Sequence, residues 1–585
     1  MAKILSISAI AHDCGIALTE DGVIKYVFEE ERFRRIKGIF NQFSFPDLSL
    51  KALEELCGIT PFDDDVIVVM PKAVLCGLDY LERLVENKTI YLYDHHYSHA
   101  CTAYYLSGFD EETLVFTHDG GDGNGIDSKI LNAEVLKQVK EQDLPYRDTG
   151  MSEEEWTQLV YSSKSNAELP RQLMIPNDSW WFHQDHTSYS CRSTISIGVD
   201  NRLDVREEIR GFDSIASLWN LYCTMNNMFG GKDEGKIVGL AAQGKFRQDI
   251  YDNIGDYFEF DGDFKWKHYY DCEYYFRTLD FTDPEMKKDG AYMIQYLTEK
   301  YFLGVISYLK KKYPKVKKLA LAGGLFSNVK VNQKINEFSE FDEIFIAPGM
   351  SDGGLALRAA IAKANETGEF NVVKIDNVFW GNPKTQFNIP TGISKAEFSA
   401  TDIAKSISKG KVIGVFSNRR EWGPRALGGT SIMFDSRRDD AQEYVNRRLG
   451  RNDIMPFAPA VMDGFEEVPF HCYKSKYASQ FMTICYDVKD EWISRIPGVI
   501  NRFDNTARIQ ITKESNKPFF PILDAFRKLT GVPVLMNTSF NIHGEPIINS
   551  TEEAFNHLIN GVVDILVVGN VVYEKSASVA SIFDT

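Results

Sequence analysis

The 585-residue sequence has few cysteines, and no two of them form a C-x-x-C pair. The nine cysteines are odd in number and scattered, which favours reduced thiols over a disulfide framework or a structural zinc site. No window offers the about 18 uninterrupted apolar residues that cross a bilayer. The first residues show no signal-peptide pattern. These absences predict a cytoplasmic chain with no membrane partner.

Positive charge is also scarce, since 83 acidic residues outnumber 65 basic residues and the formal net charge is −18. Phosphate backbones and anionic lipids attract cationic surfaces, so this charge argues against a nucleic-acid partner. Neither a G-x-x-x-x-G-K-[ST] loop nor an H-E-x-x-H helix occurs. The first absence excludes a Walker A site. The second excludes the zincin metalloproteases, which need a Glu as base between their two histidines.

The length exceeds the size at which single hydrophobic cores stop growing, so two or three domains are expected. Apolar strand patterns followed by helical periodicity indicate an α/β chain, and no internal repeat is visible. We interpret residues 366–395, rich in Asn, Pro, Gly and Thr, as a linker between domains 1–365 and 396–585. A helix is predicted over 551–560. Strands are predicted over 4–10, 16–18, 23–29, 65–69, 89–93, 114–117, 319–322, 343–346, 411–416, 532–536 and 565–568.

Two histidines four residues apart, His95 and His99, follow the predicted strand 89–93. On a helix they point the same way and can share one metal ion. Asp119, on a glycine-rich turn after the next strand, can add an oxygen ligand, while the amides of that turn can hold phosphate. The alternative is that both histidines belong to the core. For His12, on a turn between two strands, the alternative to a functional role is that it only caps its hairpin.

Two further glycine-rich turns follow strands, at 323–328 and 348–354. The first leads into a helix, so backbone amides and a helix N-terminus would face a ligand together. The second presents Asp352 at the start of a helix. Each alone is typical of a tight turn between a strand and a helix. Together with Asp119, they predict a cleft for a metal and a nucleotide at the ends of several strands.

The second half of the chain contains a cluster of arginines in an otherwise acidic protein. The planar guanidinium fork suits phosphate and carbamate oxygens, so the cluster predicts an anion site. Arg425 is the strongest candidate, together with Arg508 and Asn541, whereas Arg447 and Arg448 fit a solvated helix face. The cluster comprises Arg419, Arg420, Arg425, Arg437, Arg438, Arg447, Arg448 and Arg451.

Taken in order, these motifs resemble the NodU/CmcH-type O-carbamoyltransferases over nearly the whole chain. The resemblance implies an α/β fold with an actin/Hsp70-type (ASKHA), TsaD-like N-terminal domain and a YrdC-like α/β C-terminal domain. The matching segments are His12-Asp13, Glu29 to Phe33 with Lys37, Asp94 to Ala100, Asp119 to Asp122, Asp233 to Lys236, Gly239 to Ala241, Gly323-Gly324 with Asn328, Pro348 to Gly354, Gly423 to Gly428, Pro456 to Pro459, Ala507 to Gln510, Asn537 to Asn541 and Gly544 to Pro546.

The resemblance implies an ATP-dependent O-carbamoyltransferase of natural-product biosynthesis. The C-terminal domain would make carbamoyl-adenylate from carbamoyl phosphate and ATP, releasing pyrophosphate. The N-terminal domain would then move the carbamoyl group to a hydroxyl of a small-molecule acceptor.

Residue roles follow by position. His12 would be the general base, since a histidine neutral near pH 7 can accept the proton of an alcohol. A divalent ion, Fe(II) by the resemblance, would be held by His95, His99, Asp119 and Asp352, and Mg²⁺ would accompany ATP. The residues predicted to bind the intermediate or its precursors are Lys37, Gly324, Asn328, Arg420, Arg425, Arg508, Asn541 and His543.

The chain departs from the family pattern at three cationic positions, because Thr430, Met455 and His543 stand where relatives carry arginine. Losing one charged hydrogen-bond donor to phosphate typically weakens binding by about 1.5–3 kcal/mol. Arg358 also replaces a glycine in the helix after Asp352. The arginines that could substitute in phosphate binding are Arg419, Arg420, Arg438 and Arg451.

A long insertion at about 126–213 carries aromatic residues, including Trp180 and Trp181, that suit packing against an acceptor or, equally, a loop anchor or dimer contact. Two alternative functions stay open. A repurposed member would use another acyl donor or only bind a nucleotide. A tRNA threonylcarbamoyl-transferase shares the fold elements, although the acidic charge and the insertion count against it. The acceptor and the oligomeric state, including a homodimer, are left open.

Overall fold

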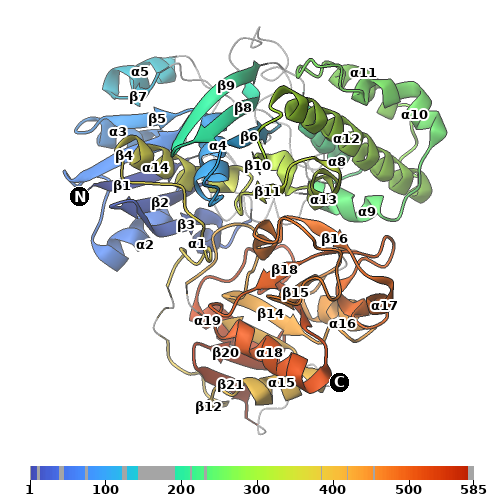
Figure 1. Cartoon of the computed structure of the whole chain (residues 1–585). Coiled ribbons are helices and arrows are strands. Elements are labelled where there is room, and N and C mark those ends of the chain that lie inside the picture. Colours follow the sequence, from blue (N-terminus) through green and yellow to red (C-terminus); the bar gives the residue numbers. More distant parts are fainter. Residues whose placement is uncertain are drawn as a thin grey trace. The chain divides into compact units, whose positions relative to one another are not determined.

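The chain divides into two compact units, Met1–Ile375 and Asp376–Thr585 (Figure 1). The division falls inside the segment 366–395 that was interpreted as a linker. In unit 1, the amide of Val373 donates to the carbonyl of Tyr105 at 2.8 Å. The computed structural model describes residues 2–9, 13–37, 45–72, 77–120, 128–141, 191–210, 214–228, 233–383, 385, 387–417, 419–451 and 455–576.

The described part of unit 1 contains two sheets that share one topology. In each, an antiparallel meander of three strands is extended by two parallel strands, so that both have the order 3-2-1-4-5. The first sheet contains β1 (Lys3–Ser8), β2 (Gly15–Glu20), β3 (Val23–Glu29), β4 (Val66–Pro71) and β5 (Ile90–Tyr93), with β7 (Ile130–Leu131) at its edge. The second contains β6 (Thr113–His118), β8 (Cys191–Val199), β9 (Arg202–Arg210), β10 (Lys318–Ala322) and β11 (Glu343–Ile346).

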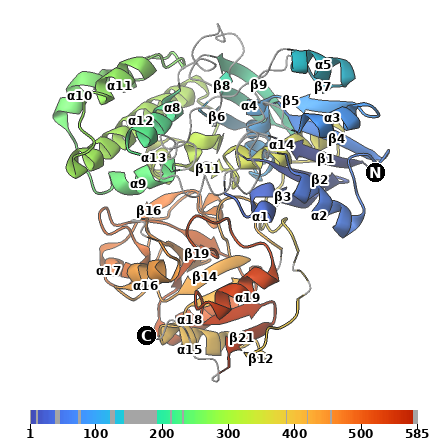
Figure 2. The same cartoon turned by 180° about the vertical axis from the view of Figure 1, so that it is seen from behind.

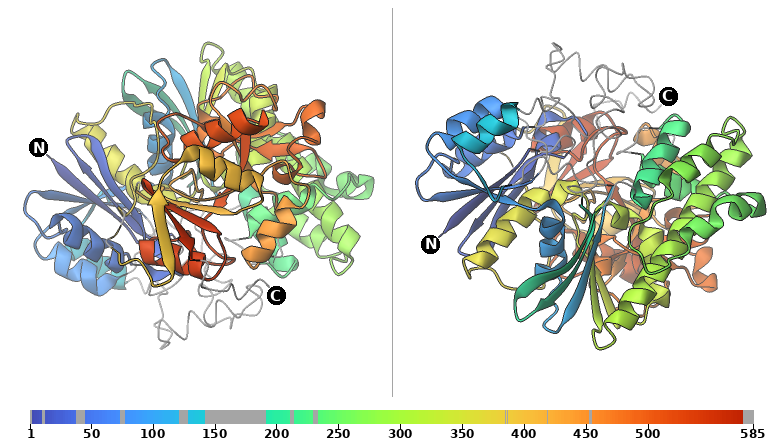
Figure 3. Two further views of the ribbon diagram at one scale, coloured as in Figure 1. Left: turned by 90° about the horizontal axis from the view of Figure 1, so that it is seen from below. Right: turned by 90° about the horizontal axis from the view of Figure 1, so that it is seen from above.

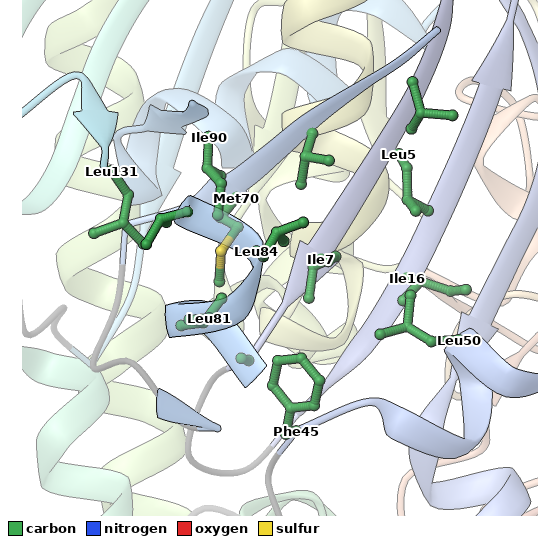
Figure 4. Close-up of a cluster of buried hydrophobic side chains, with 14 of the residues drawn as sticks. Leu5, Ile7, Ile16, Phe45, Leu50, Met70, Leu81, Leu84, Ile90 and Leu131 are labelled. Carbon is green, nitrogen blue, oxygen red and sulfur yellow. The ribbon is translucent and has the colours of Figure 1, made fainter. Parts of the chain in front are cut away.

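Two amphipathic helices, α2 (Asp47–Cys57) and α3 (Leu78–Val85), cover one face of the first sheet. Successive strand residues point to opposite faces, so Leu5 and Ile7 of β1 lie on the same side. Figure 4 shows these side chains in a cluster of apolar residues that also includes Leu81 of α3 and Leu50 of α2. This core anchors the sheet whose second face carries α14.

Two helices, α4 (His95–Tyr105) and α14 (Leu355–Glu366), lie between the two sheets of unit 1 (Figures 2 and 3). Helix α14 packs against the first sheet and α4 against the second, and the two helices contact each other. All residues of α4 except Tyr97 are buried, as expected for a helix enclosed by other elements. On the far face of the second sheet, α12 (Pro284–Lys312) places Phe302 6.4 Å from the ring of Phe116.

Unit 2 is built on a mixed sheet whose described strands have the order β12-β21-β20-β13-β14-β19-β15-β18. A separate antiparallel pair is formed by β16 and β17. The strands are β12 (Ile393–Glu397), β13 (Ile413–Phe416), β14 (Thr430–Phe434), β15 (Ala458–Met462), β16 (Cys485–Asp487), β17 (Thr506–Arg508), β18 (Gln510–Thr512), β19 (Val534–Ser539), β20 (Ile565–Val568) and β21 (Val571–Lys575). The helices on this sheet include α15 (Ala400–Ser408), α18 (Phe519–Thr530) and α19 (Thr551–Ile559).

The α/β class and every predicted strand segment are confirmed, and the predicted helix 551–560 corresponds to α19. The described end of the segment 126–213 forms β8 and β9, which complete the second sheet. Alternate residues of β9 are polar and exposed, so its sequence lacks the apolar run of the other strands. Trp180 and Trp181 lie outside the described residues. Within those residues, no helix combines the length and the apolar character that a bilayer crossing needs.

Candidate metal centre and anion site

Four predicted metal ligands meet at one edge of the second sheet. His95 and His99 occupy the first two turns of α4. Asp119 directly follows β6, and Asp352 begins the short helix η6 (Asp352–Gly354) after β11. Strands β6, β10 and β11 are parallel neighbours, so their carboxyl ends lie at the same edge and bring the two carboxylates together.

The donor atoms of the four ligands lie close to one another. His95 Nε2 is 3.1 Å from His99 Nε2 and 3.3 Å from Asp352 Oδ1. His99 Nε2 is 3.2 Å from Asp119 Oδ2 and 3.3 Å from Asp352 Oδ1. Metal–ligand bonds of about 2.0–2.2 Å place neighbouring donors roughly 3 Å apart. One divalent transition ion therefore fits these two histidines and two carboxylates.

Backbone amides hold Asp119 in place. The amide of Gly324 donates to Oδ2 at 2.9 Å, and the amide of Gly120 donates to Oδ1 at 2.6 Å. A Cβ on Gly324 would lie 2.9 Å from Asp119 Oδ1. Gly323 has φ +111, and a Cβ there would lie 2.1 Å from the carbonyl oxygen of His118. The two glycines thus allow the loop after β10 to approach the carboxylate. The part of Gly324 in binding an intermediate stays a prediction.

The histidines of α4 differ in their surroundings. Burial lowers the pKa of His99, and the guanidinium of Arg358 acts in the same direction. A neutral imidazole keeps a lone pair for a metal ion. His96, in contrast, points to β6, where its Nδ1 lies 2.8 Å from Thr117 Oγ1, and burial holds its pKa well below the usual range. His96 is therefore a histidine of the core, whereas the metal-ligand role of His95 and His99 stays a prediction.

Replacing His99 by Ala is expected to weaken the binding of a divalent ion. The loss should exceed the roughly 10–100-fold that removal of an outer partner costs, because a ligand atom itself is removed. Metal content by mass spectrometry and titration with Co²⁺ would measure it. His96→Ala is the matched control, since it removes a buried histidine of the same helix that bonds Thr117. If His99→Ala and the parent hold equal amounts of the ion, His99 is not a metal ligand and is a core histidine instead.

Two other residues of unit 1 that were predicted to bind the intermediate are Asn328 and Lys37. Asn328 caps α13 (Val329–Phe338), because its Oδ1 accepts from the amides of Lys330 and Val331, both at 3.1 Å. Its Nδ2 donates to Gln295 Oε1 at 2.9 Å. Capping and this amide pair account for both polar atoms of Asn328. Lys37 is exposed.

His12 lies outside the described residues. The carboxylate of the next residue, Asp13, lies beside the turn that carries Asp352, since a Cβ on Gly353 would be 3.7 Å from Asp13 Oδ1. The chain at Asp13 therefore adjoins the candidate metal centre.

In unit 2, side-chain amides tie together three segments that the sequence predicted to act as one site. Asn537 Nδ2 donates to the carbonyl of Ala426 at 3.0 Å and to Gln510 Oε1 at 2.6 Å. Gln510 Nε2 donates to the carbonyl of Leu427 at 2.8 Å. The loop after β13, the strand β18 and the strand β19 are thus joined through buried hydrogen bonds.

Two arginines of these segments, Arg425 and Arg508, form a cationic pair. Burial lowers the pKa of Arg425 well below its ordinary range, and the like charge of Arg508 adds to this effect. Burial lowers the pKa of Arg508 as well. In the part of the chain that the structure describes, neither guanidinium forms an ion pair with a carboxylate. Two half-buried cations with no acidic partner are the surroundings that an anion requires.

The remaining predicted residues of unit 2 divide into two groups. Arg451 reaches the loop after β19, with Nη2 3.4 Å from Ser539 Oγ. Arg438 forms an ion pair within its own loop, and Arg419 and Arg420 donate to backbone carbonyls. Of the four arginines proposed as substitutes in phosphate binding, Arg451 is therefore the best placed.

Asn541 and His543 lie in the loop after β19. Asn541 is buried and its Nδ2 donates to the carbonyls of Ile542 and Glu545 at 2.7 and 3.0 Å, so it shapes the loop. His543 is exposed.

The two arginines assigned to a solvated helix face differ from each other. Arg447 is exposed as expected. Arg448 is half-buried and pairs with Asp564 at 3.1 Å.

The sequence analysis assigned no role to Glu421, which organises the loop of Arg425. Its Oε1 accepts from the amides of Leu427, Gly429 and Thr430 at 2.9, 2.6 and 2.9 Å, and the side chain is buried. The sequence signal was a lone acidic residue among arginines, directly before a glycine-rich turn. A carboxylate that binds three amides fixes the backbone on which Arg425 stands.

Glu421→Gln is expected to loosen this loop. The amide keeps an oxygen acceptor but loses the charge that roughly doubles the strength of such hydrogen bonds. A loss of about 1 kcal/mol corresponds to roughly fivefold faster exchange of the loop amides. Hydrogen exchange of the peptide covering 427–430 would measure it, with Glu443→Gln on the exposed face of helix α16 (Ala441–Arg448) as control. Unchanged exchange would assign the order of this loop to Asn537 and Gln510 alone.

The structure thus shows an α/β chain with a candidate metal centre in unit 1 and a candidate anion site in unit 2. The chain matches the family model described as Carbamoyltransferase N-terminus over residues 65–361 and the one described as Carbamoyltransferase C-terminus over residues 404–575. It belongs to the carbamoyltransferase family and is an enzyme of that family.

Named relatives support the same family. Nodulation protein NolNO of Sinorhizobium fredii is 26% identical over 616 residues, which cover 96% of this chain and 79% of the relative. Nodulation protein NolO of Bradyrhizobium diazoefficiens is 32% identical over 271 residues, covering 44% of this chain and 49% of the relative. An uncharacterized protein of Methanocaldococcus jannaschii is 28% identical over 82% of this chain and 73% of its own length. The resemblance to NodU/CmcH-type carbamoyltransferases is confirmed.

The solved structures that were found are more distant. Full-length HypF, in its phosphate- and nucleotide-bound form, is 17% identical and covers 32% of this chain and 22% of its own, with a TM-score of 0.22. The (R)-2-hydroxyglutaryl-CoA dehydratase component A of Acidaminococcus fermentans is 10% identical, covers 63% of this chain and 97% of its own, and has a TM-score of 0.32. TM-scores at this level do not establish a common fold.

Proposed function

We propose that this carbamoyltransferase works in two steps that use ATP. Unit 2 makes carbamoyl-adenylate from carbamoyl phosphate, water and ATP: hydrolysis gives carbamate and inorganic phosphate, and the carbamate oxygen attacks the α-phosphate of ATP with release of pyrophosphate. Unit 1 then transfers the carbamoyl group to a hydroxyl of a small-molecule acceptor of natural-product biosynthesis. The retained resemblance to nodulation proteins and the family models supports carbamoyl transfer as the overall reaction.

The observation that carries the first step is the pair of half-buried guanidiniums, Arg425 and Arg508, without a carboxylate partner. Leaving two cations in a low-dielectric site is costly unless a ligand supplies negative charge. Carbamoyl phosphate and the phosphates of ATP supply it, and each guanidinium can bind two phosphate oxygens through its planar fork. Arg451 adds a third cation at the loop after β19.

The second step requires the metal centre of unit 1. His95, His99, Asp119 and Asp352 would hold a divalent ion, for which we propose Fe(II), and Mg²⁺ would accompany ATP. An ion there supplies positive charge that stabilises a departing phosphate. The amide of Gly324 orients Asp119, and the carboxylate of Asp13, the residue that follows His12 in the sequence, lies beside the turn of Asp352. His12 would take the proton of the acceptor hydroxyl.

The fold assignments that go with this function are also proposals. For unit 1 we propose an actin/Hsp70-type, TsaD-like fold, because its two sheets share the order 3-2-1-4-5 and enclose α4 and α14. For unit 2 we propose a YrdC-like fold, on the basis of the family resemblance and its mixed sheet.

The experiment that tests the function needs no acceptor. The full chain is incubated with ATP, carbamoyl phosphate and Mg²⁺, and pyrophosphate and carbamoyl-adenylate are measured by enzymatic assay and mass spectrometry. Formation that depends on carbamoyl phosphate is the expected result. ATP binding without adenylate would favour the alternative, a repurposed member with another acyl donor or a noncatalytic role, because Thr430, Met455 and His543 replace family arginines.

A further inference from the structure

One arginine lies inside the metal centre. Arg358 of α14 is fully buried, and its Nη1 contacts His99 Nδ1 and lies 3.2 Å from His99 Nε2. Its Nη2 donates to the carbonyl of Gly349. The residue stands 259 positions after the histidine that it contacts, and the sequence marked it only as a replacement for a glycine. Its position gives the cluster a fixed positive charge.

The local backbone leaves room for this guanidinium. A Cβ on Gly354, one turn earlier in the chain, would lie 2.7 Å from Arg358 Nη2 and 2.2 Å from the carbonyl of Gly349. The carboxylates of Asp352 and Asp119 attract the guanidinium electrostatically. A guanidinium stays protonated in proteins, so Arg358 faces as a cation the two carboxylates that a metal ion would also bind.

The hydrogen-bond chemistry of His99 makes the two cations mutually exclusive. A guanidinium has five N–H donors and no acceptor, so the ring nitrogen to which it donates, here the nearer Nδ1, must offer a lone pair. When Nδ1 of a neutral imidazole accepts, Nε2 carries the proton. A metal ion at Nε2 requires that lone pair, and the proton must then move to Nδ1, where it would face the N–H of Arg358. The Arg358 contact and a metal bond cannot coexist on a neutral His99.

We propose that Arg358 and a divalent ion compete for His99 and for the carboxylates of Asp119 and Asp352, so that Arg358 lowers the metal affinity of this chain and stabilises the metal-free centre. The proposal rests on the proposed metal site. It assigns to Arg358 a positioning role that acts through His99. Metal binding would displace the guanidinium from the ring, and removal of the guanidinium would leave two partly buried carboxylates that favour an ion.

The test compares the full chain with Arg358→Met, which keeps the length of the side chain and removes the charge. Titration with Co²⁺, followed by its visible absorption, is expected to give about 10- to 100-fold tighter binding in Arg358→Met than in the parent. Arg358→Lys, which keeps a cation that only donates, is expected to stay near the parent. Lys363→Met removes a positive charge from the same helix away from the ligands and is expected to leave the affinity unchanged.

Thermal unfolding with and without EDTA gives a second readout. EDTA is expected to lower the midpoint of Arg358→Met by more than that of the parent, because in the parent the guanidinium remains as a cation at Asp119 and Asp352 when the ion is removed. If Arg358→Met does not fold, Arg358→Gln takes its place. Equal or weaker Co²⁺ binding in the folded variant overturns the proposal. Carbamoyl-adenylate formation, measured on the same preparations, reports separately on the function of unit 2, so failure of one is distinguished from failure of the other.

Discussion

Arg425→Met combined with Arg508→Met is expected to abolish carbamoyl-adenylate formation in practice. Each charged donor to a phosphate contributes about 1.5–3 kcal/mol. Two together correspond to about 3–6 kcal/mol, or roughly a 10²- to 10⁴-fold loss of kcat/KM, if their effects add. The effects of the two single substitutions are expected not to add, because both arginines bind the same anion.

Methionine is chosen to replace both arginines because the two side chains are half-buried and, among the described residues, form no ion pair with a carboxylate. Removing the cations leaves no acidic group unpaired, so the variant should fold as well as the parent or better. Arg447→Met, at an exposed arginine of the same unit, is the matched control and is expected to keep full activity. Pyrophosphate release over a range of carbamoyl phosphate concentrations separates binding from chemistry. An unchanged kcat/KM in the double variant would show that carbamoyl phosphate does not bind at Arg425 and Arg508.

His12→Ala is expected to separate the two steps of the reaction. Loss of a general base typically costs 10²- to 10⁴-fold, about 3–5 kcal/mol, in the step that it serves. Carbamoyl transfer should fall by that factor, whereas adenylate formation in unit 2 should continue at the parental rate. The structural support is the neighbouring Asp13, whose carboxylate adjoins the turn of Asp352.

Radiolabelled carbamoyl phosphate and a high concentration of glycerol as a surrogate alcohol allow transfer to be followed without knowledge of the natural acceptor. Pyrophosphate release is recorded in parallel. His471→Ala, at an exposed histidine of unit 2, controls for the loss of an imidazole elsewhere and is expected to leave transfer to glycerol intact. An equal loss of both half-reactions in His12→Ala would exclude the base role and favour a turn residue that supports folding.

Large parts of the fold were predictable from local patterns. The strand segments were found because each combines apolar residues with a turn signal at its end, as in 23–29 and 343–346. The strands that were missed include β9, which has exposed polar residues at alternate positions, and β16, which has three residues. They also include the largely buried strands β8, β14 and β15. The shared topology of the two sheets has no counterpart in the sequence, because strand order depends on pairing between distant segments rather than on local composition.

The candidate metal centre shows most clearly which features follow from the sequence and which depend on the tertiary structure. The sequence by itself determined that His95 and His99 share a helix face, since a four-residue spacing aligns side chains, and that Asp119 and Asp352 stand on turns after strands. Only the tertiary structure decided that these turns meet, that the amide of Gly324 reaches a carboxylate 205 positions earlier, and that Arg358 enters the cluster. Periodicity tells which face a side chain occupies, but the neighbour on that face comes from the packing of layers far apart in the chain.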